Sequence, residues 1–256
     1  MTQEERREYL IEYLLAEGGF SDDYELKSMS GQERKNLLRS LMNIRMPEPV
    51  SKEFLAVQDE YLKQAAAEKG VTDIADLSPV ESGIYLWQGD ITALKCDAIV
   101  NAANSRLLGC FRPLHNCIDN CIHTYAGVQL RALCADIMRK QGGNEPTGMA
   151  KITPAFNLPC KYVIHTVGPT VDGILKDEDR EKLRSCYLSC LKLARENDLE
   201  SIAFCCISTG VFGFPQREAA QIAVDTVREH IKYSPVKVIF DVFKNEDRII
   251  YENLLG

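Results

Sequence analysis

The sequence has no apolar run long enough to cross a membrane and no leader that would export the chain. Its 256 residues contain no uninterrupted apolar stretch near the ~18 residues that indicate a transmembrane helix. Residues 1–7 are charged, and no apolar signal core follows them. We therefore expect a cytoplasmic protein that does not associate with a membrane.

Positive charge is also in short supply. Lys and Arg number 30 against 37 Asp and Glu, which leaves a net charge of −7 at pH 7. A protein that binds nucleic-acid backbones usually gathers its basic residues in a stripe, and none is visible in this sequence. We expect no nucleic-acid partner, and we expect backbone N–H groups rather than Lys and Arg to hold any phosphate.

The ten cysteines are not arranged as a disulfide framework. The chain is long, and no export signal directs it to an oxidising compartment where disulfides persist. Most of the cysteines lie in apolar runs and are expected to be buried as small hydrophobic residues, among them Cys186, Cys190, Cys205 and Cys206.

Residues 109–123 are the exception and form the chemical centre of the chain. This segment holds three of the ten cysteines and two of the four histidines. Four ligands from it would make a closed structural zinc site, whereas three would leave the open position that is typical of a catalytic site. The possible ligands are Cys110, His115, Cys117, Cys121 and His123.

Residues 1–80 are predicted to be a helical N-terminal extension. No catalytic pattern occurs here, so we expect a packed extension, with a partner-binding module as the alternative. Residues 72–82 are predicted to be a linker. Apolar residues at helical spacing predict three helices, which cover residues 5–15, about 31 to 47, and 51–69.

From Gly83 onward, apolar strands alternate with amphipathic helices, which indicates a largely parallel sheet covered on both faces. Loops 89–91, 101–121 and 208–213 each follow a predicted strand. Because ligands bind beyond the carboxyl ends of parallel strands, we expect these loops to converge on one site. The predicted strands cover 84–87, 98–101, 150–156, 162–167, 201–208 and 237–243, and the predicted helices cover 118–138, 178–197, 217–231 and 246–254.

Loop 208–213 contains Gly210 and Gly213 just before a predicted helix. Its backbone N–H groups and the N-terminus of that helix could hold a phosphate. An ordinary strand–helix turn explains the two glycines equally well. The loop is not a P-loop, because no Gly-Lys-Ser/Thr follows, and no Gly-x-Gly-x-x-Gly opens the first helix.

Taken together, these loops resemble the macrodomain family. The resemblance covers residues 83–256, about two thirds of the chain, and the motifs occur in the family's order. It implies a three-layer α/β/α sandwich with a mixed, largely parallel sheet and a cleft for ADP-ribose, which many members remove from modified proteins. The motifs are residues 89–92, 97–104, 118–119 with 122–123, 147–148, 162–169 and 207–213.

The resemblance also implies roles for individual residues. Asp90 would accept a hydrogen bond from the adenine amino group, and Asn104 would hold the distal ribose. Phe243 is placed to stack on adenine, with a position in the core as the alternative. The expected contacts with ADP-ribose are Asp90, Ile91, Asn104, Cys117, Ile118, Asp119, Ser208, Thr209, Gly210, Val211 and Phe212, the last five wrapping the diphosphate.

The prediction of a metal site rests on one departure from the ordinary family pattern. A run of glycines is replaced by Gly109-Cys110 and an inserted segment 111–117, which resembles the zinc-dependent subgroup of macrodomains. That subgroup also has an N-terminal helical extension. His123 stands where zinc-free relatives also have histidine, and Cys121 is expected to face the core. The remaining candidates, which suit one catalytic Zn²⁺, are Cys110, His115 and Cys117.

The function implied is a zinc-dependent hydrolase that removes mono-ADP-ribose from modified protein side chains. Asp119 would orient or deprotonate the nucleophile, unless it is only a helix N-cap. Asn104 would position the ribose, and Asn120 would assist. The resemblance further implies an Asp or Glu ester linkage and a lipoyl-carrier protein as a possible modified partner, and we expect a monomer.

Other interpretations remain open at this stage. A non-catalytic ADP-ribose reader would carry a zinc that only shapes the loop. A deacylase of acyl-ADP-ribose would act on a small molecule at the same site. The cysteine and histidine cluster could also hold no metal.

Overall fold

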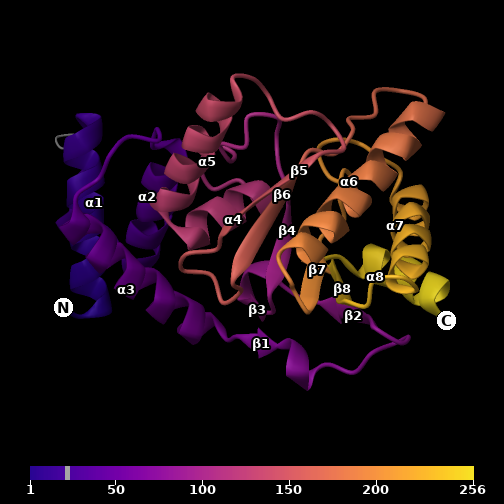
Figure 1. The fold of residues 1–256 in the computed structure, drawn as a ribbon. Coiled ribbons are helices and arrows are strands. Elements are labelled where there is room, and N and C mark those ends of the chain that lie inside the picture. Colours follow the sequence, from indigo (N-terminus) through magenta and orange to yellow (C-terminus); the bar gives the residue numbers. More distant parts are fainter. Residues whose placement is uncertain (21–23) are drawn as a thin grey trace.

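The computed structural model describes residues 1–20 and 24–256. Three helices, α1 (Gln3–Gly18), α2 (Gly31–Ile44) and α3 (Lys52–Lys69), lie together at one end of the molecule (Figure 1). They match the three helices expected from periodicity. The first two begin with a capping box, in which the side chains of Thr2 and Ser30 accept from the backbone of Glu5 and Glu33.

The three N-terminal helices bury an apolar cluster of their own. Leu10, Leu38 and Phe54 are among its buried members, and Val128 joins it from the rest of the chain. A second, larger cluster surrounds the sheet. The division into 1–80 and 83–256 stays a prediction, but the two clusters show where the apolar side chains of each part are buried.

The central sheet has six strands, in the order β2-β8-β7-β4-β6-β5. Every neighbouring pair is parallel except β5 and β6, which are antiparallel. The predicted α/β fold with a mixed, largely parallel sheet is therefore confirmed. The strands are β2 (Ile84–Gln88), β4 (Ala98–Ala102), β5 (Ala150–Pro154), β6 (Tyr162–Thr166), β7 (Ser201–Phe204) and β8 (Lys237–Val242).

Helices cover both faces of this sheet (Figure 1). On one side lie α4 (Ile118–Ala126) and α5 (Val128–Gln141), and on the other lie α6 (Asp177–Glu196), α7 (Gln216–Ile231) and α8 (Asn245–Leu255). The helix α2 of the N-terminal group packs against α4. The predicted linker contains β1 (Thr72–Asp73), which pairs with β3 (Leu94–Lys95), and the 3-10 turn η3 (Ile74–Asp76).

The single helix predicted over residues 118–138 is wrong in one respect. Gly127 has a φ of +98°, in the left-handed region, and separates α4 from α5. A Cβ at this position would lie 2.6 Å from side-chain atoms of Gln58 and Gln129. The break lets the Gln58 side chain of α3 accept from the backbone N–H of Val128, at 2.9 Å.

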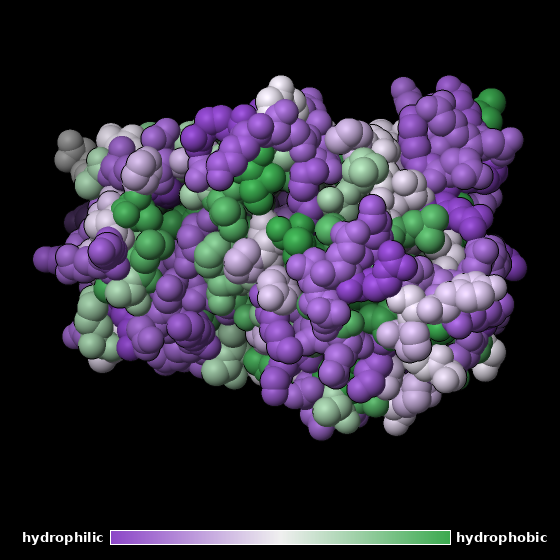
Figure 2. Space-filling view, in the orientation of Figure 1, coloured by the Kyte–Doolittle hydropathy of each residue, from purple (hydrophilic) through white to green (hydrophobic). Residues whose placement is uncertain are grey.

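Within the described part of the chain, no helix is both long enough and apolar enough to cross a bilayer. Figure 2 shows a face covered mostly by hydrophilic residues, with hydrophobic residues in smaller patches between them.

Candidate active site

Three loops meet at the carboxyl ends of the parallel strands. They follow β2, β4 and β7, which run in the same direction. Backbone hydrogen bonds tie them to neighbouring strands and loops: Gly89 donates to Val242, and Ala103 donates to Thr166. The three loops expected to converge therefore share one edge of the sheet, where ligands bind in folds of this kind.

Cys110, His115 and Cys117 are brought together in the second loop. Their ligand atoms all lie within 4.8 Å of one another, and Cys110 Sγ is 3.5 Å from His115 Nδ1. All three residues are half-buried. Two sulfurs and one imidazole nitrogen at such separations suit one tetrahedral Zn²⁺ with a fourth position left over.

Cys121 lies outside this group, as expected, but does not face the core. It is half-buried, and its Sγ lies 3.7 Å from Arg39 Nη2 of α2. The expectation of a core position is therefore wrong: helix α2 covers the surface that this side chain points to.

His123 is buried and belongs to a different cluster, with Cys134 and His165. The ring of His123 packs under Gly109, where a Cβ would come within 2.7 Å of it. Burial lowers the pKa of His165 to about 4 and that of His123 well below its ordinary value. Neutral imidazoles beneath the loop fit the structural role expected for His123.

Asp119 lies in the first turn of α4, and its side chain is buried. Its two oxygens accept from Asn101 Nδ2 at 2.8 Å and Asn104 Nδ2 at 3.2 Å. The N-cap of α4 is Cys117, whose Sγ accepts from the backbone N–H of Asn120 at 3.4 Å. The interpretation of Asp119 as the N-cap is therefore wrong, and its carboxylate is directed towards the loop after β4. Burial raises its pKa to about 6.

The two asparagines of the prediction both bond the loop that carries the candidate metal ligands, and Asn104 also bonds the acid. Asn104 Nδ2 donates to Gly109 O at 3.0 Å as well as to Asp119. Asn120 is fully buried, and its Nδ2 donates to Cys110 O at 3.1 Å and to Arg112 O at 3.0 Å. Asn104 thus bonds the carbonyl of the residue before Cys110, and Asn120 bonds the carbonyl of Cys110 itself.

Asp90 follows β2 and caps the short turn η4 (Ile91–Ala93). Its Oδ1 accepts from Thr92 N at 2.9 Å, and its other oxygen pairs with Lys69 from the end of α3. Burial alone would raise the pKa of Asp90, but the bonds from Lys69 and Thr92 outweigh it and hold the pKa below its ordinary value. Ile91 is buried beside it, and Ile118, the first residue of α4, is half-buried.

The loop after β7 presents unused backbone donors. Within the described residues, no hydrogen bond uses the N–H of Ser208, Gly210, Val211 or Phe212, whereas those of Thr209 and Gly213 are paired. Ser208 has a φ of +66°, and a Cβ on Gly168 would lie 2.0 Å from Ser208 Oγ. A glycine at 168 thus permits a strained loop whose N–H groups are free to bind an anion.

Phe243 is 75% exposed, so the alternative of a core position is wrong. Sequence reasoning also missed Arg39, Asn43, Lys69 and Arg131, which reach the site from three helices. Single polar residues on amphipathic helices give no local signal of what they will contact.

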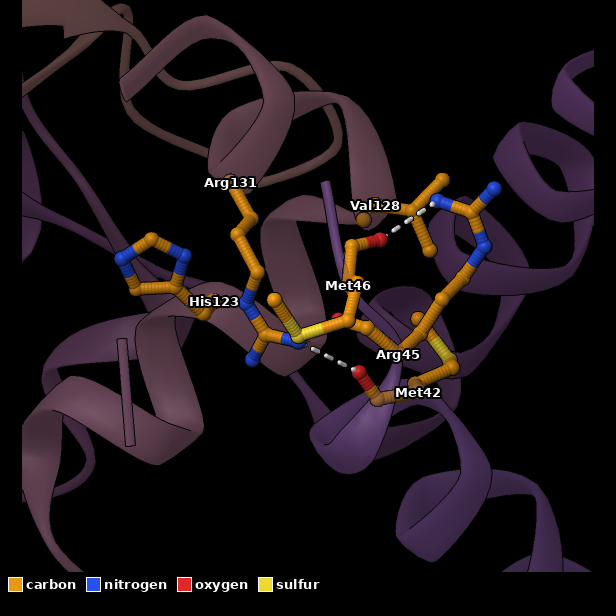
Figure 3. Close-up of a pocket in the computed structure, with 7 residues that line it drawn as sticks. Met42, Arg45, Met46, His123, Val128 and Arg131 are labelled. Atoms are coloured by element: carbon orange, nitrogen blue, oxygen red, sulfur yellow. Dashed lines mark hydrogen bonds between the residues drawn. The ribbon is translucent and has the colours of Figure 1, made fainter. Parts of the chain in front are cut away.

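A small cavity lies between the end of α2 and the start of α5 (Figure 3). Its volume is about 10 Å³, room for no more than a water molecule. Met42, His123 and Arg131 line it, and Arg131 bonds the carbonyl of Met42 across it at 3.1 Å. This cavity is too small to be the ligand site, and the three converging loops remain the candidate.

Comparison with known proteins agrees with this fold. The model of the Macro domain family matches residues 100–223. A protein-ADP-ribose hydrolase of Treponema medium is 56% identical over the full length of both chains. The chain belongs to the macrodomain family.

Two further relatives widen the comparison. A protein-ADP-ribose hydrolase of Staphylococcus aureus (strain MSSA476) is 52% identical, over 96% of this chain and 94% of its own. The crystal structure of the Trypanosoma brucei macrodomain in complex with ADP-ribose is 31% identical, with a TM-score of 0.66, over 85% of this chain and 95% of that one.

Proposed function

We propose that this protein is a zinc-dependent hydrolase that removes mono-ADP-ribose from protein side chains, acting on Asp or Glu esters. The observation that carries the proposal is the group of Cys110, His115 and Cys117, in a loop whose Gly109 carbonyl is bonded by Asn104, which also donates to the buried acid Asp119. Two relatives over 50% identical are named protein-ADP-ribose hydrolases, which supports the same activity.

Binding of ADP-ribose would use both ends of the site. The Asp90 carboxylate would accept from the adenine amino group, and the free N–H groups of Ser208, Gly210, Val211 and Phe212 would bind the diphosphate. Support comes from the Trypanosoma brucei macrodomain, a relative with ADP-ribose bound. This arrangement would direct the distal ribose towards Asn104 and Asp119.

The residues present fit a zinc ion, because two thiols and an imidazole are the donors that Zn²⁺ prefers. When bound, zinc would polarise an oxygen of the ribose or of the leaving group, or lower the pKa of a water. Cys110, His115 and Cys117 would hold it with one coordination position open.

The chain's own residues would perform the proton transfer. Asp119, oriented by Asn101 and Asn104, would position a water and accept its proton as the water oxygen bonds to C1″ of the distal ribose. The bond from C1″ to the side-chain oxygen breaks, and the electron pair leaves with the carboxylate of the modified protein. The products are ADP-ribose and the unmodified side chain. A lipoyl-carrier protein is one candidate for the modified protein.

The test is release of ADP-ribose from a modified protein by wild type, by chelator-treated wild type and by Cys117→Ala. Loss of activity in the last two, with recovery of the treated wild type on adding zinc, is expected. Cys121→Ala is the matched control, because this cysteine lies nearby but outside the ligand group. Full activity of both chelated wild type and Cys117→Ala would overturn the zinc mechanism.

The same preparations separate the two other functions. Tight ADP-ribose binding by calorimetry without turnover of any modified protein would indicate a reader. Turnover of acyl-ADP-ribose but not of modified protein would indicate a deacylase.

A further inference from the structure

The segment that carries the three metal-ligand candidates has little regular structure of its own. Between β4 and α4, the backbone bonds within the loop are Leu107 to Asn104 and His115 to Arg112, the latter at 3.3 Å. Leu114 has a φ of +56°, a left-handed conformation that costs energy for a residue other than glycine. The shape of this loop must therefore be held by hydrogen bonds from side chains.

Three side chains of the macrodomain part hold the first half of the loop. Arg131 Nε donates to Leu108 O at 2.8 Å. Asn104 donates to the carbonyl of residue 109, and Asn120 donates to the carbonyls of residues 110 and 112. The Arg131 guanidinium also lies 4.3 Å from the centre of the Phe111 ring. None of these bonds reaches the backbone at positions 114 and 115.

The second half is held by helix α2 of the N-terminal extension, which packs against α4 (Figure 1). Asn43 is 1% exposed; its Oδ1 accepts from Leu114 N at 3.1 Å, and its Nδ2 donates to Thr124 Oγ1 at 2.8 Å. Arg39 Nη2 donates to His115 O at 2.8 Å. The strained residue and the histidine ligand candidate are thus both fixed from α2.

Arg39 also connects this half of the loop to the other. The same Nη2 lies 3.1 Å from Asn120 Oδ1, and the Nδ2 of that amide holds Cys110 O and Arg112 O. Arg131 in turn bonds Met42 O at the end of α2 (Figure 3). Helix α2 is therefore linked to the loop backbone at His115 directly and at Cys110 through Asn120.

We propose that α2 is a positioning element of the metal site, with Arg39 and Asn43 setting where His115 lies relative to Cys110 and Cys117. The N-terminal extension would then be required for metal affinity and not only for stability. This inference rests on the zinc site of the proposed function. Groups that orient metal ligands typically change metal affinity by about 10–100-fold when removed.

The experiment measures zinc affinity by competition with a chromophoric chelator for Arg39→Ala and Asn43→Ala in the full chain. We expect each to bind zinc at least ~10-fold more weakly than wild type. ADP-ribose affinity, measured by calorimetry without zinc, should change little, because the Asp90 end of the site is not touched. Arg39→Lys keeps one donor and should fall between Arg39→Ala and wild type.

The extension offers a matched control for each variant. Arg34 lies on the same helix but pairs with Glu4 inside the extension, at 3.1 Å. Gln58 is a buried amide of α3 that accepts from a macrodomain N–H, as Asn43 does, but at Val128 rather than in the loop. Arg34→Ala and Gln58→Ala should lower thermal stability by amounts similar to those of their counterparts while keeping zinc affinity within about twofold of wild type.

Each outcome bears on the proposal. Equal zinc affinity in wild type, Arg39→Ala and Asn43→Ala would overturn it and leave the proposed function intact. Loss of affinity in the two control variants as well would also overturn it, because a general loss of stability would then explain the effect. If wild type binds zinc tightly but hydrolyses nothing, the proposed function fails, and weaker zinc binding by Arg39→Ala and Asn43→Ala would still support the positioning role of α2.

Loss of ADP-ribose binding by an alanine variant would indicate misfolding. The zinc affinity of Arg39→Lys is then the one to compare with that of wild type. A zinc affinity of this variant equal to that of wild type would overturn the proposal. An affinity at least several-fold weaker would support it.

Discussion

Lys69, the last residue of α3, pairs with Asp90 at the end of β2. Its Nζ also lies 3.0 Å from Thr92 Oγ1 and 4.5 Å from the centre of the Tyr125 ring. The N-terminal extension therefore contacts the predicted adenine end of the site through α3 and the loop of the candidate metal ligands through α2.

This pair predicts a pH effect on ligand binding. Lys69 helps to hold the pKa of Asp90 below its ordinary value, so the carboxylate stays an acceptor as the pH falls. In Lys69→Met that pKa rises, and ADP-ribose binding should be lost at a higher pH than in wild type, with little change near pH 7. Calorimetric titrations between pH 4 and 7 would measure this, with the exposed Lys63→Met as the control. Loss of ADP-ribose binding at the same pH in Lys69→Met and Lys63→Met would contradict the prediction.

Asp119→Asn should separate binding from chemistry. The amide keeps the shape of the side chain but cannot accept a proton. We expect turnover of a modified protein to fall by roughly 10²-fold or more, the usual contribution of a general base, while ADP-ribose affinity stays within a few-fold. Single-turnover kinetics with calorimetry would measure the two quantities. A rate constant within about threefold of wild type would exclude Asp119 as the base.

Val211→Pro tests the backbone donors of loop 208–212. The Val211 side chain is 79% exposed, and its N–H is free within the described residues. Proline removes that N–H, and loss of a hydrogen bond to a charged phosphate should weaken ADP-ribose binding by about tenfold or more. Val211→Ala keeps the N–H and is the control. Equal affinities of the two variants would show that this donor does not contact the ligand.

Asp97 predicts a pH-dependent contribution to stability. Its carboxylate accepts from Glu200 N at 2.7 Å and Ser201 N at 3.0 Å and pairs with Lys161 at 2.6 Å, joining the starts of β4 and β7. Burial alone would raise its pKa, but these partners outweigh burial and lower it. A lowered folded-state pKa means that the contribution is complete above the unfolded pKa of about 4 and is lost as the pH falls through the folded value.

At pH 7, Asp97→Asn should therefore lower the free energy of unfolding by about 1.5–3 kcal/mol. The difference from wild type should shrink as the pH falls below about 4. Urea unfolding at a series of pH values would measure both, with Asp177→Asn, whose side chain is 98% exposed, as the control. A difference that stays constant with pH would rule out ionisation as its origin.

Most elements could be predicted from periodicity and from glycine and proline. Gly19 ends α1 in the left-handed conformation, and the strands alternate with helices as expected. The break at Gly127 was missed because apolar residues continue in phase on both sides of it, such as Ile122 and Leu130. One glycine in a helical pattern does not reveal whether its φ is positive.

The candidate site could be predicted in part for a simple reason. Cys110, His115 and Cys117 span only eight residues, so a single loop can bring them together. The role of Asp119 could not be settled, because aspartate is favoured both at helix starts and in catalytic sites. Its side-chain partners, Asn101 and Asn104, decide against the cap.

The amino-acid sequence was enough to predict the macrodomain fold, which the structure confirms, and to name the candidate metal ligands and the loops of the candidate site. That the N-terminal helices reach the candidate site is visible only in the packing of the folded chain. Arg39 and the His115 carbonyl it bonds are 76 positions apart, and Lys69 and Asp90 are 21 apart. The spacing of apolar residues on a helix shows which face is buried, but what its polar residues contact depends on how the helix packs against the rest of the chain.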